Sequence, residues 1–452
     1  MNTTEILAYV QQHPAGKVKL AIADIDGVLR GKYISSEKFA SVVKGKLGFC
    51  DVTLGWDVGD IVYDNVDFTG WHTGYPDALV KIDLATFRKI PWENDIPFFL
   101  GEFVTENDQP VYACPRQLLQ KIILDATQNG FIPYFSQEFE WFNFTETPDS
   151  AQQKNYRDLA PITPGMFGYS ILRSALKNEF MTNLFELLVK FDIPVEGLHT
   201  ETGPGVYEAA IKYAGALQAA DQAILFKTSV KEIAYKHGIM ATFMAKINEN
   251  LPGCSGHVHQ SLWDAAGNNN LFYDEKDPQF MSDTMKSYIA GQLYCLPHIL
   301  PMIAPTVNSY KRLVEGAWAP TTLTWGIDNR TVALRALPGN SKATRLETRV
   351  VGSDTNPYLA LAACLAAGLY GVKNKLPLNK KNTIGNGYKD TSNGVLPQNL
   401  HAATQEMKNS PIAKELFGDL FVAHFTQTRE WEWRQYAKAV TDWELKRYFE
   451  II

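Results

Sequence analysis

The chain has 452 residues, with 43 Lys and Arg against 49 Asp and Glu, so its formal net charge is −6. This length exceeds what a single hydrophobic core usually supports, and we therefore expect two or more domains. The mild acidity argues against a protein that binds nucleic acid or an anionic membrane, because such proteins usually carry a basic stripe.

The hydrophobic and cysteine patterns are those of a soluble protein. The longest apolar stretch, residues 359–372, is too short to span the ~30 Å hydrocarbon core of a bilayer. The first residues show no basic segment followed by an apolar core, so we expect no export signal. The five cysteines are scattered without a CxxC motif, which favours reduced thiols in a cytoplasmic protein without membrane contact.

The first hundred residues show a pattern typical of strands and turns. Residues 17–24 and 27–34 resemble strands, and the Asp26-Gly27 step between them predicts a hairpin. Residues 80–84 and 97–104 are predicted to form further strands.

The pattern changes near residue 114. Pro115 suits the first turn of a helix, and apolar residues follow it at helical spacing as far as Asn129-Gly130. We place a boundary between residues 104 and 114, which predicts an N-terminal domain of residues 1–108 and a second domain of residues 109–452.

The second domain is predicted to mix strands and helices. We expect strands at 131–144 and 240–247, and helices at 169–190, 205–237, 356–372 and 442–448. Residues 374–399 are rich in Gly, Asn, Lys and Thr, which indicates a long surface loop.

One N-terminal motif is similar to that of a different enzyme class. Residues 21–29 resemble the opening motif of haloacid dehalogenase phosphatases, in which Asp24 would be the nucleophile and Asp26 an acid. That fold needs a series of parallel crossovers before its metal-binding acids, and the roughly thirty residues up to Asp60 and Asp64 leave no room for them. We favour the hairpin and keep the phosphatase as an alternative.

Two acidic residues lie two positions apart in the predicted strand 131–144. A period of two places Glu138 and Glu140 on one face, and Phe139 and Trp141 on the other. Like charges on one face repel, so a bound cation is one reason to tolerate them. The alternative is the solvated outer face of an antiparallel strand.

A second set of candidates surrounds the turn Gly203-Pro204-Gly205. It consists of Glu196, His199, Glu201 and Glu208. We expect Glu208 to begin a helix, where an acid either compensates the helix dipole or binds a metal. A third set follows downstream, since His257 and His259 share a face if they lie in a strand, and with Ser261 they suit a metal or a phosphate.

A fourth set is cationic and falls between residues 312 and 349, with Glu347 among its members. It consists of Arg312, Arg330, Arg335, Lys342, Arg345 and Arg349. Arginine forks match carboxylate and phosphate oxygens, although structural salt bridges are an alternative for any one of them. Combined with the acids and histidines, these cations indicate a metal–nucleotide site for phosphoryl transfer, with a hard divalent ion such as Mg or Mn.

The order of these motifs resembles that of the glutamine synthetase family across nearly the whole chain. In chain order the motifs are DIDGVLRGKYIS, EFE, HTETGPGVYE, GCSGHVHQS, NSYKRLV, DNRT, RLETR, NPYLALAACLAAG and DWELKRYFE. So many ordered motifs make the resemblance far more specific than any single motif.

The resemblance implies an α+β fold, in which an N-terminal β-grasp domain precedes a catalytic domain with a barrel-like antiparallel sheet and helices. It implies a homo-oligomer, a dodecamer of two rings, whose sites combine the catalytic domain of one subunit with the N-terminal domain of its neighbour. The implied activity is an ATP-dependent phosphorylation of the γ-carboxylate of glutamate, after which an amine displaces the phosphate to form a γ-amide.

The functional residues of the family carry over motif by motif. The resemblance implies two to three Mg or Mn ions, one of them held by Glu140, Glu201 and Glu208 and a second by Glu138, His257 and Glu347. It implies ATP contacts for Glu196, His259, Ser261, Arg335, Lys342 and Arg345. Gly253, Arg312, Arg330 and Arg349 would hold glutamate, Arg330 would also stabilise the phosphate during transfer, and His199 would lie near that phosphate.

Three positions depart from the family pattern. Ammonia-using members usually carry a glutamate in a flap reading PGYEAP, whereas this chain has Trp318 within Glu315-Gly-Ala-Trp-Ala-Pro320, and indole cannot take a proton from ammonium. Pro252 replaces an Asn that contacts the amino group of glutamate, which leaves a glutamate analogue open as the acid substrate. Asp51 is a loose counterpart of the neighbouring subunit's Asp that binds ammonium.

The departures favour a glutamate–amine ligase similar to γ-glutamylpolyamine and γ-glutamylmethylamide synthetases. We expect Trp318 to line a pocket for an organic amine through cation–π contact and apolar burial. Two alternatives stay open. One is a glutamine synthetase proper that uses ammonia, and the other is an inactive structural homologue, which would be expected to have lost metal-binding acids.

Overall fold

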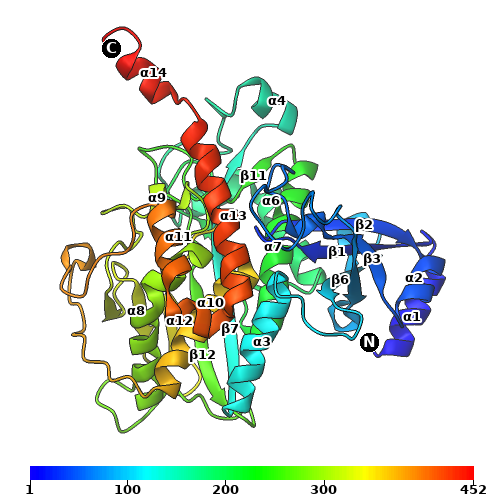
Figure 1. Ribbon diagram of the computed structural model, residues 1–452. Helices are drawn as coiled ribbons and strands as arrows, with labels where there is room; N and C mark the ends of the chain where they lie inside the picture. The colour runs from blue at the N-terminus through cyan, green and yellow to red at the C-terminus, as the bar shows by residue number, and fades with distance from the viewer.

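The first hundred residues form a six-stranded sheet that lies to one side of the rest of the molecule (Figure 1). The computed structural model describes residues 1–452. The strands are β1 (Lys17–Ala23), β2 (Leu29–Ser35), β3 (Leu47–Cys50), β4 (Asp77–Ile82), β5 (Arg88–Ile90) and β6 (Ile96–Val104). Their order is β2-β1-β6-β4-β3, with β5 beside β6. Helices α1 (Thr3–Gln12) and α2 (Ser36–Val42) pack on this sheet through a small apolar core around Phe39 and Phe99.

The predicted N-terminal hairpin is confirmed. Strands β1 and β2 pair antiparallel along their full length. Gly27 lies in the turn with φ of +79°, and the Asp24 amide donates to the Val28 carbonyl at 3.0 Å. A Cβ at position 27 would lie 2.8 Å from the Cα of Asn356, so the hairpin tip fits closely against the second unit.

The second unit is built on a nine-stranded sheet in the order β13-β14-β15-β12-β7-β9-β8, with β10 and β11 also paired to β7. The strands are β7 (Phe131–Phe144), β8 (Val195–Thr200), β9 (Val206–Ile211), β10 (Ala214–Gly215), β11 (Met240–Thr242), β12 (Val258–Asp264), β13 (Trp325–Ile327), β14 (Leu334–Leu337) and β15 (Arg345–Thr348). Because β7 pairs with four other strands, it organises the sheet. All of its pairings are antiparallel, and only β13 and β14 pair in parallel.

Helices pack against this sheet and against one another (Figure 1). They are α3 (Pro115–Gln128), α4 (Pro148–Gln153), α5 (Ile171–Leu176), α6 (Asn178–Lys190), α7 (Ala216–Lys236), α8 (Asp283–Ile303), α9 (Ser309–Arg312), α10 (Pro357–Lys373), α11 (Leu400–Asn409), α12 (Pro411–Phe417), α13 (Asp419–Lys438) and α14 (Asp442–Tyr448). The predicted helix 356–372 corresponds to α10, which is almost entirely buried. The expected α+β class is therefore confirmed.

The single helix predicted at 205–237 is wrong. Residues 206–211 form strand β9, and only residues 216–236 form helix α7. Gly205 has φ of +69°, which turns the chain back along β8, and the segment then pairs with both β7 and β8. Glu208 consequently lies in the middle of a strand, so compensation of a helix dipole does not explain it.

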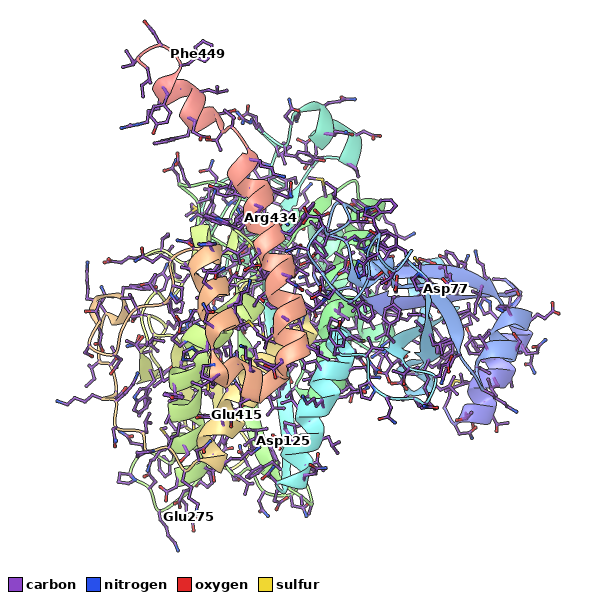
Figure 2. The ribbon with its side chains drawn as sticks, viewed as in Figure 1. Asp77, Asp125, Glu275, Glu415, Arg434 and Phe449 are labelled. Atoms are coloured by element: carbon purple, nitrogen blue, oxygen red, sulfur yellow. The ribbon has the colours of Figure 1, made fainter.

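Other predicted boundaries also shift. The predicted helix 169–190 is two helices, α5 and α6, because Lys177 leaves the helical region with φ of −124°. The predicted strand 240–247 is reduced to β11, of three residues. Residues 374–399 are irregular as expected, apart from a 3₁₀ turn at Gly387–Lys389. The predicted C-terminal helix is α14, which extends away from the body of the molecule, and Phe449 lies just beyond it (Figure 2).

Contacts between charged and polar groups join the two units. Arg429 of α13 pairs with Asp26 in the hairpin turn, and Asn356 donates to the carbonyls of Asp24 and Ile25. Lys19 of β1 lies 3.2 Å from Glu232 of α7. The five cysteines are all free, as expected, and none of the helices is long and apolar enough to cross a membrane.

Candidate active site

A cavity of about 930 Å³ lies against the nine-stranded sheet. Most residues singled out from the sequence line it. They are Glu138, Glu140, Glu196, Glu201, Glu208, Pro252, Gly253, His257, His259, Ser261, Trp318, Arg330, Arg335, Lys342, Arg345 and Arg349. His199, Arg312 and Glu347 lie behind the lining and contact residues that belong to it. The fold therefore gathers groups as far apart in the chain as Glu138 and Arg349, as the predicted metal–nucleotide site requires.

Strand β7 supplies the first two carboxylates. Glu138 and Glu140 face the cavity, whereas Phe139 and Trp141 are fully buried on the opposite side. Phe139 stacks on Phe226 of α7 with ring centroids 5.6 Å apart. The alternative of a solvated outer face is thus wrong, because one face of β7 packs on a helix and the other forms the cavity wall.

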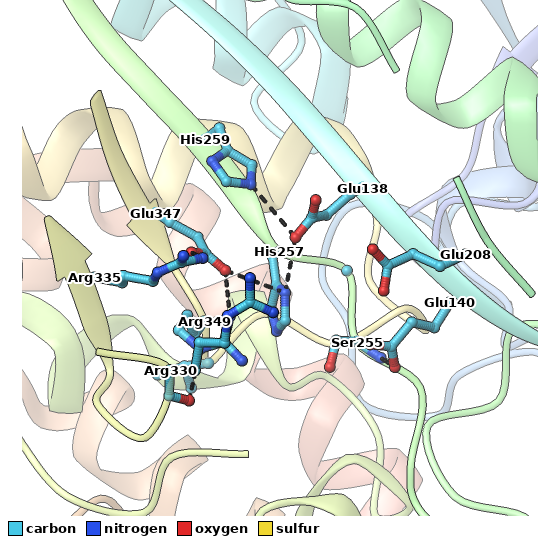
Figure 3. Close-up of polar contacts among 12 residues, drawn as sticks. Glu138, Glu140, Glu208, Ser255, His257, His259, Arg330, Arg335, Glu347 and Arg349 are labelled. Carbon is cyan, nitrogen blue, oxygen red and sulfur yellow. Dashed lines mark hydrogen bonds and ion pairs between the residues drawn. The ribbon is translucent and has the colours of Figure 1, made fainter. Parts of the chain in front are cut away.

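The first acidic cluster lies where β7, β12 and β15 meet (Figure 3). Glu138 Oε1 is 3.0 Å from His257 Nδ1 and 3.4 Å from His259 Nε2. Glu347, which is fully buried, brings Oε1 to 3.3 Å from His257 Nδ1. The donor atoms of Glu138, His259 and Glu347 also lie within 4.8 Å of one another. His259 is therefore a second imidazole candidate at a cluster for which the resemblance implied His257.

The second acidic cluster joins β7 to β8 and β9. The strand register sets Glu140 directly beside Glu208 (Figure 3). His199 Nε2 lies 3.4 Å from Glu208 Oε1, and His199 Nδ1 lies 3.8 Å from Glu201 Oε2. The donor atoms of His199, Glu201 and Glu208 lie within 4.8 Å of one another. His199, which we expected only to lie near the phosphate, is thus close enough to bind the same metal ion as Glu201 and Glu208.

The electrostatic environment differs between the two clusters. Burial, reinforced by neighbouring Glu208, raises the pKa of Glu140 to about 8, and burial also raises the pKa of Glu208. In the first cluster burial is outweighed, since His259 and His257 hold the pKa of Glu138 well below its usual value. Arg349 and the same histidines likewise overcome burial and lower the pKa of Glu347 to about 2. The first cluster is therefore surrounded by positive charge, whereas in the second only His199, whose contact with Glu208 outweighs burial and raises its pKa, pairs with the carboxylates.

The donor set fits hard divalent cations. Carboxylate oxygens with a minority of imidazole nitrogens are the ligands that Mg and Mn prefer. The nitrogen of His257 that lies between Glu138 and Glu347 is Nδ1, 3.0 Å and 3.3 Å from their carboxylate oxygens, so an imidazole nitrogen and two carboxylates converge on one point, as a metal ion requires. A cation between Glu140 and Glu208 would favour their charged forms, and so oppose the rise in pKa that burial, together with neighbouring carboxylates, causes in both.

The arginines of the cavity are partly engaged in ion pairs. Arg335 Nη1 lies 2.8 Å from Glu347 Oε2, and Glu347 also pairs with Arg349 (Figure 3). Arg345 Nε donates to His259 Nδ1 at 3.2 Å. Structural salt bridges, the alternative considered from the sequence, are therefore present for Arg335 and Arg349. All three also line the cavity, so they remain able to contact an anionic ligand there.

Arg312 is fully buried and does not reach the cavity lining. It donates to the carbonyls of Val350 and Arg349 and to Ser255 Oγ, which does line the cavity. A Cβ on Gly253 would lie 2.5 Å from the Ala245 carbonyl and 2.8 Å from Arg312 Cγ. Gly253 therefore lets the chain pass directly over Arg312, and a side chain at position 253 would disturb this wall of the site.

Trp318 lines the rim of the cavity from a loop. Its side chain is 59% exposed and its φ is +56°, a backbone region that large side chains seldom adopt. Tyr169, which we did not single out from the sequence, also lines the cavity and has φ of +56°. Its ring lies over that of His199, with centroids 4.3 Å apart. Such backbone strain is concentrated at functional sites, but a lone tyrosine gives no sequence signal for it.

An aromatic group lines another part of the cavity and was also missed. Tyr134 packs edge-on against Tyr213 and Trp263, with centroids 5.9 Å and 5.6 Å apart, and all three line the cavity. Trp263 donates its indole N–H to Ser261 Oγ at 3.0 Å. Tyr134 and Trp263 each lie two positions from a serine, Ser136 in β7 and Ser261 in β12, and this even spacing was the signal available in the sequence, because such side chains share one face of a strand.

Asp51 is the one candidate that does not join the others within the chain. It lies in a 3₁₀ turn, Asp51–Leu54, of the N-terminal unit, is buried, and accepts a hydrogen bond from Thr69 Oγ1 at 2.6 Å. It is absent from the cavity lining. Any role in this chemistry would require a neighbouring subunit.

The two aspartates of the phosphatase-like motif are held in structural contacts. Asp24 accepts from the amides of Asp26 and Val28 and pairs with Arg30 at 2.8 Å, while Asp26 pairs with Arg429. Asp24 is 1% exposed and neither residue lines the cavity. These contacts support the hairpin interpretation over the phosphatase.

Comparisons with known proteins agree with this geometry. A family model described as the glutamine synthetase catalytic domain matches residues 112–448. The chain is 56% identical over 438 residues to type-1 glutamine synthetase 2 of Dictyostelium discoideum, covering 96% of this chain and 84% of that protein. It is 37% identical over 449 residues to a glutamate–isopropylamine ligase of a Pseudomonas species, covering 98% and 97%. The solved GmaS–ADP complex matches with a TM-score of 0.85 at 25% identity, covering 99% and 100% of the two chains.

The nine-stranded sheet, the paired acidic clusters and the arginines are those of a carbon–nitrogen ligase. The chain belongs to the glutamine synthetase family, as the resemblance in the sequence indicated. Members of this family use ATP and divalent metal ions, and act on glutamate with ammonia or an amine.

Proposed function

We propose that the protein is a glutamate–amine ligase, which forms a γ-glutamyl amide from glutamate, ATP and an organic amine through a γ-glutamyl phosphate intermediate. The observation that carries the proposal is Trp318 at the cavity rim, where ammonia-using members are expected to have a glutamate. An indole cannot accept a proton from ammonium, whereas its face attracts an alkylammonium ion. The similarity to the glutamate–isopropylamine ligase over nearly the full length of both chains supports this choice.

We assign the cavity residues to substrates by their positions in the motifs of the family. Glu138, His257 and Glu347 would hold one divalent ion, Mg or Mn, and Glu140, Glu201 and Glu208 another, with His259 and His199 as further imidazoles beside them. When bound, such ions neutralise the negative charge of the phosphates. The assignment therefore gives this chain's carboxylates the role of binding and positioning, rather than of exchanging protons.

The remaining polar residues would contact the two anionic substrates. Glu196, His259, Ser261, Arg335, Lys342 and Arg345 are assigned to ATP, and Gly253, Arg312, Arg330 and Arg349 to glutamate. Arg330 would also stabilise the phosphoryl group during transfer, because a guanidinium suits the charge that develops on its oxygens. Arg312 would act through Ser255 and Gly253, since the cavity lining lies between it and the substrate.

The proposal extends to the organisation of the protein. We take residues 1–108 as a β-grasp domain and residues 109–452 as the catalytic domain, a division that the gap between β6 and α3 supports. We also propose a cytoplasmic homo-oligomer, a dodecamer of two rings, in which Asp51 reaches the cavity of a neighbouring subunit.

A panel of amines tests the activity. Phosphate release would be followed with glutamate, ATP, Mn or Mg, and either ammonium or a series that includes methylamine, isopropylamine, ethanolamine and a polyamine. We expect at least one alkylamine to exceed ammonium in kcat/KM. If ammonium exceeds every amine, the protein is a glutamine synthetase proper, an alternative that the 56% identity to a type-1 glutamine synthetase favours. If neither ammonium nor any amine gives turnover, it is an inactive homologue.

Variants of Trp318 test the residue itself. Trp318→Glu should lower kcat/KM for the preferred amine about tenfold and raise it for ammonium, because a carboxylate replaces the aromatic face. Trp318→Phe is the matched control, which keeps an aromatic ring and should retain the preference for the amine. Equal losses for amine and ammonium in Trp318→Glu would contradict a role in selection.

A further inference from the structure

Trp318 lies in the loop of residues 313–320. The segment that follows this loop is hydrogen-bonded to a distant part of the chain. Residues 380–396, which we call the strap, run beside residues 321–331. Trp325 Nε1 donates to the Lys380 carbonyl and Thr322 Oγ1 to the Gly387 carbonyl, both at 2.8 Å, while the Leu323 amide donates to the Gly394 carbonyl at 3.0 Å. The strap is thus bonded to the chain between Trp318 and Arg330, although the sequence suggested only a surface loop.

The centre of the strap has a fixed position. The Gly387 amide donates to Thr331 Oγ1 at 2.8 Å, and Asn329 Nδ2 donates to the carbonyls of Thr383 and Gly385. A Cβ on Gly387 would lie 2.7 Å from the Thr331 carbonyl, so the strap approaches this chain as closely as a glycine allows. These contacts determine where the next two residues, Tyr388 and Lys389, lie.

Tyr388 is buried beneath the Trp318 loop. Its hydroxyl oxygen is inaccessible and has no hydrogen-bond partner of good geometry. Burial raises the pKa of this hydroxyl, and the nearby guanidinium groups of Arg349 and Arg312 and the Trp318 amide oppose the rise. An unpaired buried hydroxyl is costly, so a small movement of the Trp318 amide toward it would be favourable.

Lys389 reaches the other end of the same loop. Its ammonium group pairs with the carboxylate of Glu315, and the two side chains are 69% and 52% exposed. Exposed ion pairs are weak and are screened by salt. Such a pair suits a loop that has to open and close in every turnover, because it biases the closed state without locking it.

We propose that Tyr388 and Lys389 are positioning residues that hold the Trp318 loop over the cavity. Lys389 retains the loop through Glu315, and Tyr388 offers its hydroxyl as the acceptor for the Trp318 amide. The inference rests on the proposed function for the nature of the co-substrate, whereas the loop contacts themselves do not depend on it. Its functional consequence is the exclusion of water, since an open loop would expose the acyl phosphate to hydrolysis.

Hydrogen–deuterium exchange of the full-length protein tests the contacts directly. In a peptide that covers residues 313–320, Lys389→Ala and Glu315→Ala should each exchange about two- to fivefold faster than the wild type, which is the effect expected from loss of an exposed ion pair. The charge-swapped double variant E315K/K389E should return the rate to that of the wild type. Lys381→Ala, a change at an exposed lysine of the strap without an ion pair, is the matched control and should change nothing.

Two further measurements separate positioning from a general loss of stability. Tyr388→Phe keeps the ring in place, so its melting temperature should stay close to that of the wild type while exchange in the loop becomes faster. In assays with the best co-substrate, ammonium included, Lys389→Ala and Tyr388→Phe should release more phosphate per amide formed, with the KM for ATP unchanged.

These experiments can show the inference about the loop to be wrong independently of the amine-ligase proposal. Wild-type exchange rates in Lys389→Ala and Glu315→Ala, or no restoration by the charge swap, would overturn the inference. If the enzyme proves to use only ammonium, but the loop exchanges faster in the variants and recovers in the swap, the inference stands and the amine-ligase proposal falls.

Discussion

Burial sets the ionisation of several single side chains in this protein more strongly than any one charged neighbour does. Glu140 and Glu208 each lie beside another carboxylate, yet burial is the largest contribution to the raised pKa of both. The same effect acts in the opposite direction on imidazoles, and it lowers the pKa of His257 to about 4. Glu347 is paired with two arginines, whereas Glu140 and Glu208 pair with none, so the charge of these two carboxyl groups depends most on whether a cation enters the cavity.

His424 allows this effect to be measured away from the cavity. The residue lies on α13, is 2% exposed, and packs edge-on against Phe68 of the N-terminal unit and against Tyr112. Neither ring nitrogen has a hydrogen-bond partner, and burial lowers its pKa to about 4. In the unfolded chain the imidazole would titrate near pH 6.5, so the unfolded state binds more protons between pH 6.5 and 4.

The wild type should therefore lose stability relative to His424→Phe as the pH falls below 6.5. At pH 5 the difference should have grown by about 2 kcal/mol compared with pH 7.5, since each pH unit contributes about 1.4 kcal/mol. Denaturant midpoints of the two proteins at pH 7.5 and pH 5 check this. Parallel pH dependence of the two midpoints would show that His424 is protonated in the folded state.

At the scale of elements, close packing of glycines fixes the helices behind the sheet. Helices α8 and α10 are packed together so tightly that a Cβ on Gly368 would lie 2.0 Å from the ring of Tyr288. Gly371 and Gly291 form a second such contact between the same helices. Tyr288 in turn donates to Gln260 of β12, which carries the cavity residues His259 and Ser261. The helix pair thus supports the strand from behind.

Gly368→Ala should accordingly destabilise the protein. The methyl group cannot be accommodated without moving Tyr288, and overpacking of this kind costs about 1–3 kcal/mol. Thermal unfolding should show a melting temperature lower by several degrees, and the affinity for ATP should weaken with it. Gly45→Ala is a suitable control, because its Cβ would meet no atom closer than 3.9 Å, and it should leave the melting temperature nearly unchanged.

At the scale of the whole molecule, the cavity is built entirely from the second unit. The N-terminal unit contacts that unit through Asp26, Lys19 and the hairpin, yet its candidate residue Asp51 does not line the cavity of its own chain. A single subunit therefore places every metal-binding candidate but not the residue expected at the amine end. A ring of subunits would resolve this, because each N-terminal unit could then serve the next cavity.

Mixed oligomers provide the measurement. Asp51→Ala alone should have strongly reduced activity, and so should Glu208→Gln alone, because each change removes one half of a shared site. When the two variants are co-expressed and assemble at random, about a quarter of the sites would combine two intact halves, so activity should recover to about a quarter of the wild-type level. Mixed oligomers that stay as inactive as the single variants would contradict a shared site.

The sequence correctly predicted features that depend on neighbouring residues. The hairpin at Asp26-Gly27, the start of α3 at Pro115 and the alternation of Glu138 and Glu140 all follow from patterns of two to four residues. It failed at residues 205–211, because a short run with apolar residues at 206, 207, 209 and 211 is compatible with either a strand or a helix. The neighbours β7 and β8 decided the outcome, and they lie outside any local window.

The sequence by itself determined which chemical groups the protein has and on which side of each strand they project, because those properties are local. Only the tertiary structure decided that Glu140 lies beside Glu208, that His199 also approaches Glu208, that Tyr169 covers His199, and that Lys389 of the strap pairs with Glu315 of the Trp318 loop. Each of these contacts depends on strand register or on chain segments far apart in sequence. Their positions are set by the packing of the complete fold, and no local pattern encodes them.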